Sequence, residues 1–484
     1  MGGPVTPTAA EGWEPVIGLE VHCELRTATK LFCGCRNAFG DEPNTNVCPV
    51  CLGLPGSLPV LNAMAVDYAM RIGTALHCEI RPSLFHRKNY FYPDMPKDYQ
   101  ISQYDEPINA NGWLELPDGT RVGVERAHME EDTGKTTHIG GGGRIHDARH
   151  SLVDYNRAGV PLVEIVSRPD IRSAAQARLY AAELRGILIA TGASDGRMEE
   201  GSLRVDANVS VRRPGDEFGT RCEIKNLNSL RSLVRAIEYE ISRQIDVLES
   251  GGAVAQQTRH WDEDEAVTGA LRSKEEAFDY RYFPEPDLVR LAPDAGWQAD
   301  VAAAVGPMPA DRRAALAALL GPDGSSGARS DQIATVVEHG LDDLMTEAVS
   351  AGIGAALALA RTANEASAEP DRARAVDPAR FAALLRMEQD GTLSATQTKD
   401  VLGDLLQNGG NPAELARVHG YEALETDFLV AVMDELVAAH PDEWERYAGG
   451  DDKLAGFFTG LAMKATDKKA NGKSVAAELR RRRG

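Results

Sequence analysis

The stretch VIGLEVHCEL, residues 16–25, alternates apolar and polar side chains. In a β-strand, residues two positions apart lie on the same face of the sheet. The apolar residues of this stretch would therefore share one face: Ile17, Leu19, Val21, Cys23 and Leu25. Glu20, His22 and Glu24 would share the other. The stretch predicts a strand that packs on a core through one face and presents acids and a histidine on the other.

The same alternation recurs in SLRVDANVSVR, residues 202–212, and in CEIKN, residues 222–226. The polar positions of these two stretches are Arg204, Asp206, Asn208, Ser210, Glu223 and Lys225. A solvated polar face is ordinary for one strand. Several such strands instead predict a concave, metal-lined sheet. Helical stretches lie between them, so this part of the chain reads as an α+β domain.

HMEEDTGK, residues 128–135, continues into Thr136 and so contains Gly-Lys-Thr. A phosphate-binding loop needs a glycine where this chain has Met129. Three consecutive acids, Glu130 to Asp132, would also repel a nucleotide triphosphate unless a divalent cation stood between them. The stretch favours metal binding over a P-loop.

Glu164 is an acid within the otherwise apolar stretch GVPLVEIVSRPD, residues 159–170. A charged residue in such a strand usually has a partner. A cation held by Glu20, His22, one of the three consecutive acids and Glu164 would have oxygen ligands and one imidazole. That set suits Mg²⁺ or Mn²⁺.

HRKNYFYPDMPKDYQISQ, residues 86–103, places Arg87, Lys88 and Lys97 among aromatic residues. Such a segment could supply positive charge for phosphate groups and stacking surfaces for a nucleotide base. Packing of an aromatic-rich loop on its own domain is the structural alternative.

Four cysteines cluster with the spacing C-x-C-x12-C-x2-C: Cys33, Cys35, Cys48 and Cys51. Two close pairs joined by a short loop are typical of a tetrahedral thiolate zinc site with no open coordination position. The spacing predicts a structural zinc ion. The other cysteines, Cys23, Cys78 and Cys222, are expected in the core.

The composition is that of a globular protein, with 484 residues, 43% hydrophobic and 26% charged. It contains no apolar run of about 18 residues, the length that spans a bilayer. Residues 1–14 are expected to be a flexible leader without a secretory signal, which predicts a soluble cytoplasmic protein. The net charge of −21 opposes non-specific nucleic-acid binding, although the C-terminus is locally basic. Its basic residues are Lys464, Lys468, Lys469, Lys473 and Arg480 to Arg483.

The sequence pattern changes after about residue 292, from short alternating segments to Ala, Leu, Asp and Glu at helical spacing. We therefore predict an α+β domain over residues 15–292, with the zinc-binding insertion near 33–51, and helical domains over 293–404 and 405–484. A solvated tail is the alternative for the basic C-terminus.

Seven stretches, in this order along the chain, resemble the B subunit of the bacterial tRNA-dependent amidotransferases that make Gln-tRNA(Gln) and Asn-tRNA(Asn). They are VIGLEVHCEL, RKNYFYPDMPKDYQISQ, HMEEDTGKTTH, NRAGVPLVEIVSRPDIRS, MEEGSLRVDANVSVR, EIKNLNS and DYRYFPEPD. The resemblance implies a cradle-shaped antiparallel-sheet domain related to glutamine synthetase, followed by helical linker and tail domains, the tail binding tRNA.

The resemblance also implies a ligase activity. With ATP and Mg²⁺ the protein would phosphorylate the side-chain carboxylate of misacylated Glu-tRNA(Gln) or Asp-tRNA(Asn). Ammonia would then attack the acyl phosphate. The ammonia would come through a channel from a separate glutaminase subunit, with a small third subunit completing a heterotrimer.

The family's metal positions carry over onto Glu20, His22, Glu131 and Glu164. The choice of Glu131 over Glu130 rests on the resemblance, because strand alternation alone does not decide it. Lys88, Arg204 and Lys225 are the candidate basic groups for the transferring phosphoryl group. Arg87, Lys88, Asp206 and Asn208 are the candidate ATP contacts.

Two other functions compete with this hypothesis. A P-loop NTPase would use the Gly-Lys-Thr sequence, but Met129 argues against it. A non-enzymatic zinc-containing RNA-binding module would use the cysteines and the basic tail, but leaves the polar sheet face without a purpose.

Overall fold

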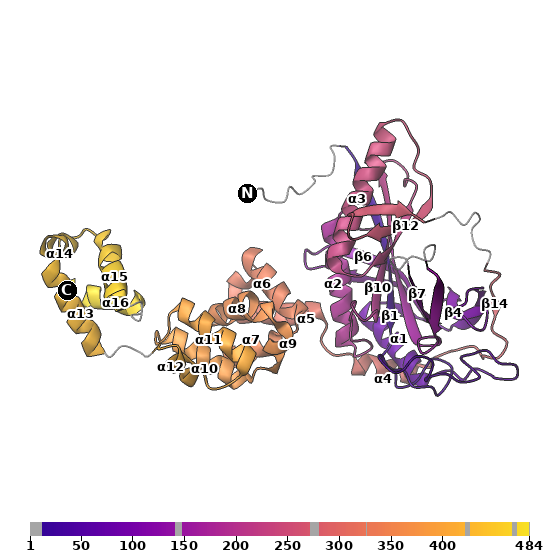
Figure 1. The fold of residues 1–484 in the computed structure, drawn as a ribbon, viewed down its shortest axis with the longest axis horizontal. Helices are drawn as coiled ribbons and strands as arrows, with labels where there is room; N and C mark the ends of the chain where they lie inside the picture. The colour runs from indigo at the N-terminus through magenta and orange to yellow at the C-terminus, as the bar shows by residue number, and fades with distance from the viewer. Residues whose placement is uncertain are drawn as a thin grey trace. The chain divides into compact units, whose positions relative to one another are not determined.

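The computed structural model describes residues 12–140, 148–271, 280–325, 327–421, 426–466 and 472–483. The chain divides into two compact units, residues 1–310 and 311–484 (Figure 1). The first unit contains the sheet and the second is helical. Lys468 and Lys469 of the basic C-terminus, and residues 1–11 of the expected leader, lie outside the described residues.

In the described chain, the first unit is built from strands and four helices, and the last of these helices ends at Ala304. Its strands are β1 (Glu14–Glu24), β2 (Glu79–Ile80), β3 (Leu84–Asn89), β4 (Tyr99–Glu106), β5 (Asn109–Glu115), β6 (Arg121–Glu131), β7 (Lys135–Ile139), β8 (His150–Asp154), β9 (Pro161–Ser167), β10 (Leu203–Arg212), β11 (Cys222–Leu227), β12 (Gln257–Asp262), β13 (Val267–Ala270) and β14 (Phe283–Pro284). Its helices are α1 (Ala63–Ala75), α2 (Ala174–Ala190), α3 (Leu230–Glu249) and α4 (Ala295–Ala304).

Twelve of these strands form one sheet in the order β13-β12-β11-β10-β1-β9-β6-β4-β3-β14, with β5 joining β6 and β2. Neighbouring strands are antiparallel except β11 and β12, which are parallel. The α+β class is confirmed, but the sheet is mixed and not fully antiparallel. The reason is local: α3 connects β11 to β12, and a helical crossover returns the chain in the parallel sense.

Helices α1, α2 and α3 pack on one face of the sheet and form its main core (Figure 1). Ser173 and Ser229 cap the N-termini of α2 and α3 through side chains that accept backbone N–H bonds. The apolar positions of β1 face these helices, with Ile17, Leu19 and Val21 buried. The period-two alternation of the strand therefore leaves its polar residues on the opposite face.

Both ends of the sheet domain differ from the sequence-based bounds. The Trp13 indole donates to Glu249 at 3.0 Å, and Glu14 begins β1, so both residues lie in the sheet domain and not in a leader. At the other end, Val301 of α4 is buried in the sheet-domain core, with Trp297 packed against it. The domain therefore continues beyond residue 292, because α4 covers apolar surface that α1 presents.

The second unit is formed by helices with two separate apolar cores. Its elements are α5 (Pro309–Leu319), η1 (Gly321–Ser325), α6 (Gly327–Glu338), α7 (Asp342–Ser350), α8 (Ala355–Asn364), η2 (Ala366–Ala368), α9 (Pro370–Ala375), α10 (Pro378–Gln389), α11 (Ala395–Asn408), α12 (Pro412–Val418), α13 (Thr426–Ala439), α14 (Pro441–Ala448), α15 (Leu454–Ala465) and α16 (Gly472–Arg483). One core spans Leu316 to Ala416 and the other Leu429 to Leu479. The sequence-based boundary at 404/405 falls inside α11, whose Leu402, Leu405 and Leu406 share the first core.

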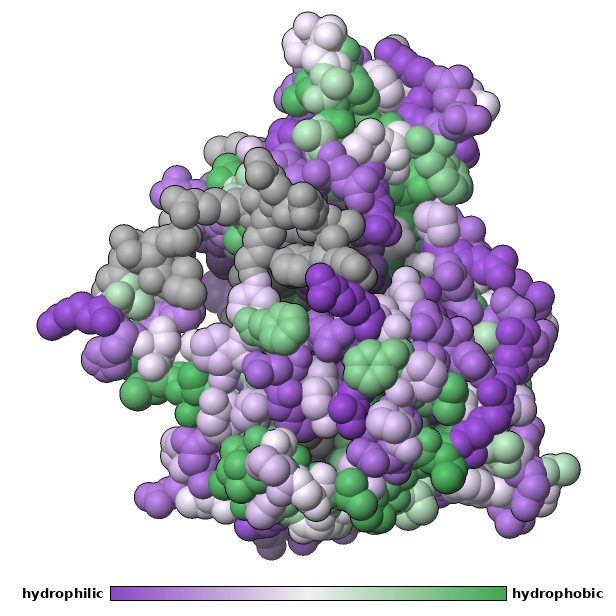
Figure 2. Space-filling view, turned by 90° about the vertical axis from the view of Figure 1, so that its right-hand side faces the viewer, coloured by the Kyte–Doolittle hydropathy of each residue, from purple (hydrophilic) through white to green (hydrophobic). Residues whose placement is uncertain are grey.

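None of the helices in the described parts of the chain is both long and apolar enough to cross a membrane. On the face shown in Figure 2, hydrophilic and apolar residues are interspersed.

Candidate functional site

A row of polar residues crosses the open face of the sheet through four adjacent strands. His22 of β1 lies opposite Arg204 of β10 on one side and opposite Glu164 of β9 on the other. Glu164 in turn lies opposite His128 of β6. Directly opposite residues bring their Cβ atoms to about 5 Å. The register therefore brings together residues that are far apart in the sequence.

Three side chains of this face converge closely enough to hold one metal ion: His22, Glu130 and Glu164. One ligand atom from each lies within 4.8 Å of the other two. The His22 Nε2 atom is 3.4 Å from a Glu164 carboxylate oxygen. The Oε2 atom of Glu130 is buried and has no hydrogen-bond partner within the described chain. A divalent cation would complete these groups, because a buried carboxylate oxygen without a partner is costly.

The charged groups at this centre shift one another's pKa values. Burial opposes the charged form of His22, but the hydrogen bond and charge of Glu164 raise the pKa of His22 to about 9. Burial works against ionised Glu164 as well, yet its hydrogen bond with His22 holds its pKa below the usual range. Burial and the neighbouring Glu164 raise the pKa of Glu130 to about 7. The centre thus retains proton-binding capacity that a metal ion would displace.

Glu20 lies beside this centre on β1 and accepts a hydrogen bond from Asn208 at 2.9 Å. Burial, followed by the charge of Glu164, raises the pKa of Glu20. Lys225 lies 3.0 Å from Glu223 and 3.5 Å from Asp206. Burial raises the pKa of Asp206, although Lys225 opposes the shift. Lys225 is therefore a cation held by two acids at the edge of the site.

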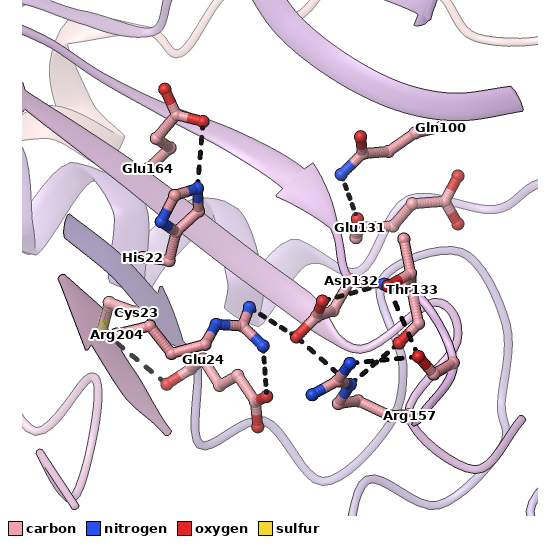
Figure 3. A network of polar contacts seen from close by, with 11 residues as sticks. His22, Cys23, Glu24, Gln100, Glu131, Asp132, Thr133, Arg157, Glu164 and Arg204 are labelled. Carbon is pink, nitrogen blue, oxygen red and sulfur yellow. Dashed lines mark hydrogen bonds and ion pairs between the residues drawn. The ribbon is translucent and has the colours of Figure 1, made fainter. Parts of the chain in front are cut away.

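Glu131, the position inferred from the family resemblance, does not join this group. It follows Glu130 directly, so strand alternation directs its side chain to the other face. Its carboxylate accepts from the Lys97 ammonium and from the backbone N–H of Ile101. Figure 3 shows that carboxylate directed away from His22 and Glu164. The structure thus brings Glu130, and not Glu131, to the candidate metal centre.

Arg204 lies beside the centre in a separate network of charges (Figure 3). It donates to Asp132 at 2.7 Å and lies 3.8 Å from Glu24. Burial and the negative charge of Asp132 raise the pKa of Glu24, while Arg204 and Arg157 hold the pKa of Asp132 low despite its burial. Arg204 therefore neutralises neighbouring acids in this state.

A pocket of about 720 Å³ opens over the polar face. Of the residues selected from the sequence, it is lined by Glu20, His22, Lys88, Glu164, Asn208 and Lys225. Arg87 lies elsewhere, because alternation along β3 turns it away from Lys88. Arg87 pairs with Glu285 through two hydrogen bonds and lies 4.3 Å from the centroid of the Tyr99 ring.

Several residues that line the pocket were not predicted from the sequence. His128 is fully buried, and neither of its ring nitrogens has a hydrogen-bond partner in the described chain. Burial lowers the pKa of His128 to about 4, so the imidazole is neutral. Tyr104 stacks on Tyr282 with ring centroids 5.5 Å apart, and the Arg126 guanidinium lies 4.5 Å from the Tyr104 ring. The two-residue spacing of His128 and Glu130 indicates that they share one face of a strand. Only the strand pairing shows that this face also carries Glu164.

The four cysteines form a second candidate metal centre, in the segment between β1 and α1. The four sulfur atoms all lie within 4.8 Å of one another; they belong to Cys33, Cys35, Cys48 and Cys51. The Cys48 and Cys51 sulfurs are 3.8 Å apart, close to the spacing of about 3.8 Å that Zn–S bonds of ~2.3 Å give in a tetrahedron. A hydrogen bond from Cys33 lowers the pKa of Cys51 to about 5, which favours a thiolate ligand.

The basic C-terminus is engaged by acids. Arg481 and Arg482 both pair with Glu478, and Arg482 also pairs with Asp434. Arg483 pairs with Asp452. Much of the arginine run therefore holds α16 to its own helical core.

Comparison with known proteins gives matches over most of the chain. Residues 15–299 match the family described as the GatB/GatE catalytic domain, and residues 345–482 match the GatB domain. A Frankia casuarinae protein, named as the B subunit of aspartyl/glutamyl-tRNA(Asn/Gln) amidotransferase, is 49% identical over 491 residues, covering 98% of this chain and 96% of the relative. Proteins of the same name from a Mycobacterium strain and from Salinispora tropica are 49% and 47% identical, covering 97% and 98% of this chain and 95% and 97% of the relatives.

The His22–Glu164 pair predicts a pH-dependent contribution to the stability of metal-free protein. The pKa of folded His22, about 9, lies above the ordinary 6.5, and the pKa of folded Glu164 lies below the ordinary 4.5. The pair therefore stabilises fully between pH 4.5 and 6.5, and it loses this effect as the pH rises through 9. We expect Glu164→Gln to lower the free energy of unfolding by about 2 kcal/mol more at about pH 6 than above about pH 9. Urea denaturation in the presence of a chelator measures this. An equal loss at both pH values would contradict the ion pair.

Proposed function

The chain belongs to the B-subunit family of the aspartyl/glutamyl-tRNA(Asn/Gln) amidotransferases, and from this premise we propose the reaction that its polar pocket performs. The chain activates the side-chain carboxylate of misacylated Glu-tRNA(Gln) or Asp-tRNA(Asn) by ATP-dependent phosphorylation. Ammonia then displaces phosphate from the acyl phosphate and leaves the amide, Gln-tRNA(Gln) or Asn-tRNA(Asn). The enzyme is a ligase.

The chemical need for ATP follows from the substrate. A carboxylate is a poor acyl donor because ammonia would have to expel oxide. Phosphorylation replaces that leaving group with phosphate. The protein's contribution is then to position the reactants and to neutralise the charge on the transferring group.

The observation that carries this proposal is the convergence of His22, Glu130 and Glu164 in a pocket that Lys88 and Lys225 also line. We propose that the first three hold Mg²⁺, with Glu20 beside them. When bound, the ion supplies positive charge that binds phosphate oxygens and stabilises the charge on the transferring phosphoryl group. Without that charge, the acids of the pocket would repel the phosphates of ATP.

The remaining lining residues have roles that follow from their charge. Lys88 and Lys225 flank the acids on either side of the sheet centre and would neutralise the outer phosphate oxygens. Asn208 orients Glu20 through its hydrogen bond. Arg204 and Asp206 do not line the pocket; they form ion pairs with Asp132 and Lys225 on the same face. Arg87 binds Glu285, which directly follows the adjoining strand β14. Arg87 would therefore not contact ATP in this pocket.

The four cysteines would hold structural zinc, since four thiolates leave no position for substrate. For the fold as a whole, we propose a cradle of glutamine-synthetase-like architecture, supported by the pocket on one face of its sheet. The helical unit would bind the body of the tRNA. A separate glutaminase subunit would supply ammonia, a small third subunit would complete the complex, and the complex would act in the cytoplasm.

The reaction is tested with variants of the metal-binding centre in the reconstituted complex. Glu164→Gln and His22→Ala should each lower amide formation from misacylated tRNA by on the order of 10²–10³-fold, because phosphate charge is no longer neutralised. Both should also abolish the Mg²⁺-dependent, tRNA-dependent release of phosphate from ATP. The control is Glu115→Gln, an exposed acid of β5. Near-normal amide formation by folded Glu164→Gln protein would exclude the proposal.

Elemental analysis tests the cysteine centre. We expect one zinc ion per chain in protein prepared without chelators, and a lower melting temperature for Cys48→Ser because the loop loses its cross-link. The rate of the folded Cys48→Ser enzyme at saturating Mg²⁺ should fall much less. Zinc-free protein with an unchanged melting temperature would reject this assignment.

The role of the last helices is tested by truncation after Tyr421, which removes the second helical core and leaves the first complete. If those helices grip the tRNA body, KM for misacylated tRNA should rise roughly tenfold or more while kcat changes little. Steady-state kinetics at several tRNA concentrations measure the two effects separately. An unchanged KM would show that the segment binds something else.

A further inference from the structure

Lys97 and Glu131 form an ion pair that the mechanism above does not use. Their side chains are 6% and 2% exposed. The Glu131 carboxylate accepts from the Lys97 ammonium and from the Ile101 N–H at 2.9 Å. The Glu131 backbone oxygen also accepts from the Gln100 amide at 2.7 Å. Side chain and backbone of Glu131 are thus held together by β4 and the turn before it.

The loop that carries the four cysteines, residues 32–54, encloses this pair. A Cβ added to Gly53 would lie 2.6 Å from Cγ and 3.0 Å from Cα of Lys97, so the loop backbone rests directly on that side chain. The Phe32 ring centroid lies 5.9 Å from the Lys97 nitrogen. On the other side, a Cβ on Gly159 would lie 3.7 Å from Cys51 Cβ and 3.8 Å from a Glu131 carboxylate oxygen. The cysteine centre and Glu131 therefore share one packed region.

The consequence for the polar face follows from strand geometry. Glu130 and Glu131 are consecutive at the end of β6, and their side chains project to opposite faces. Contacts that fix Glu131 on one face fix the backbone from which Glu130 projects on the other. The Glu130 Oε2 atom has no hydrogen-bond partner of its own in the described chain. The direction of the Glu130 side chain therefore depends on the backbone at the end of β6.

We infer that Lys97 and Glu131 are positioning residues: their buried ion pair, enclosed by the cysteine loop, holds the end of β6 so that Glu130 reaches the metal centre with His22 and Glu164. This inference rests on the function proposed above. The cysteine centre thereby takes part in the geometry of the catalytic pocket. Its contacts reach Glu131 at the end of β6 from Gly53 by way of Lys97, and from Cys51 by way of Gly159.

Stability alone is a weak reason for such a pair. Desolvation of two buried charges offsets most of their attraction, and apolar replacements of similar volume are often neutral or stabilising. A positioning role instead predicts a specific loss. Removing the ion pair should weaken metal binding on the opposite face. The effect should exceed that of other substitutions that lower the free energy of unfolding by the same amount.

The test is Mn²⁺ binding, followed by electron paramagnetic resonance on the full-length chain in its purified complex. Lys97→Met, which keeps the apolar stem and removes the charge, should weaken Mn²⁺ binding roughly tenfold, as is usual when a group that orients a ligand is lost. The double variant Lys97→Met/Glu131→Gln leaves no unpaired buried charge, so it remains testable if the single variant fails to fold. Its Mn²⁺ affinity should be similarly reduced.

The matched control is Arg259→Met in the same domain. Arg259 is 9% exposed and lies 3.2 Å from the fully buried Glu240, on the outer strands of the sheet. It should lower the melting temperature while changing Mn²⁺ affinity less than about twofold, the effect of a distant independent site. An equal loss of affinity in Arg259→Met would reduce the Lys97 effect to general destabilisation and overturn the inference.

Cys48→Ser tests the connection to the cysteine centre. It should weaken Mn²⁺ binding in otherwise unchanged protein but add little in the Lys97→Met background, because both changes act through the end of β6. Fully additive losses would reject that connection.

Glu164→Gln separates failure of the inference from failure of the proposed function. Mn²⁺ binding that Glu164→Gln abolishes but Lys97→Met leaves unchanged would overturn the positioning role and keep the metal centre. Mn²⁺ binding that does not depend on Glu164 would remove the metal centre and the positioning role together.

Discussion

The burial of several acids on one face of a sheet is the constraint on which the site depends. Glu20, Glu130 and Glu164 lose water by burial and repel one another, and His22 offsets only part of this charge. The alternation of each strand places these groups, and the apolar core on the helical face holds the strands in register. A sheet built this way favours cation binding, because the ion supplies positive charge that the neighbouring side chains do not.

The polar face is divided into regions with different electrostatic balance. At one end, Arg204 and Arg157 neutralise Asp132, and Glu24 shares that network. Near the candidate metal centre, Glu130 keeps a carboxylate oxygen that has no hydrogen-bond partner among the described residues. On the far side, Lys225 is held between Glu223 and Asp206. Positive groups therefore border the acids, an arrangement that suits a substrate with several negative charges.

The end of β6 shows how one strand can serve two purposes. Its residues alternate between the pocket face, with His128 and Glu130, and the opposite face. There Met129 lies in the apolar core and Glu131 lies beside the cysteine loop. Packing behind the strand and chemistry in front of it share one backbone. The loop that carries the four cysteines can thereby influence a pocket to which it contributes no side chain.

The sequence by itself determined the α+β class, the polar and apolar faces of β1 and β10, and the four cysteines as one group, because periodicity and ligand spacing are local properties. It also selected Glu20, His22, Lys88, Glu164, Asn208 and Lys225, which the pocket brings together. Only the tertiary structure decided between Glu130 and Glu131, turned Arg87 toward Glu285, added His128, and made β12 parallel to β11. Each of these depends on which strand lies beside which, and strand pairing joins residues too far apart in the chain for any local pattern to specify.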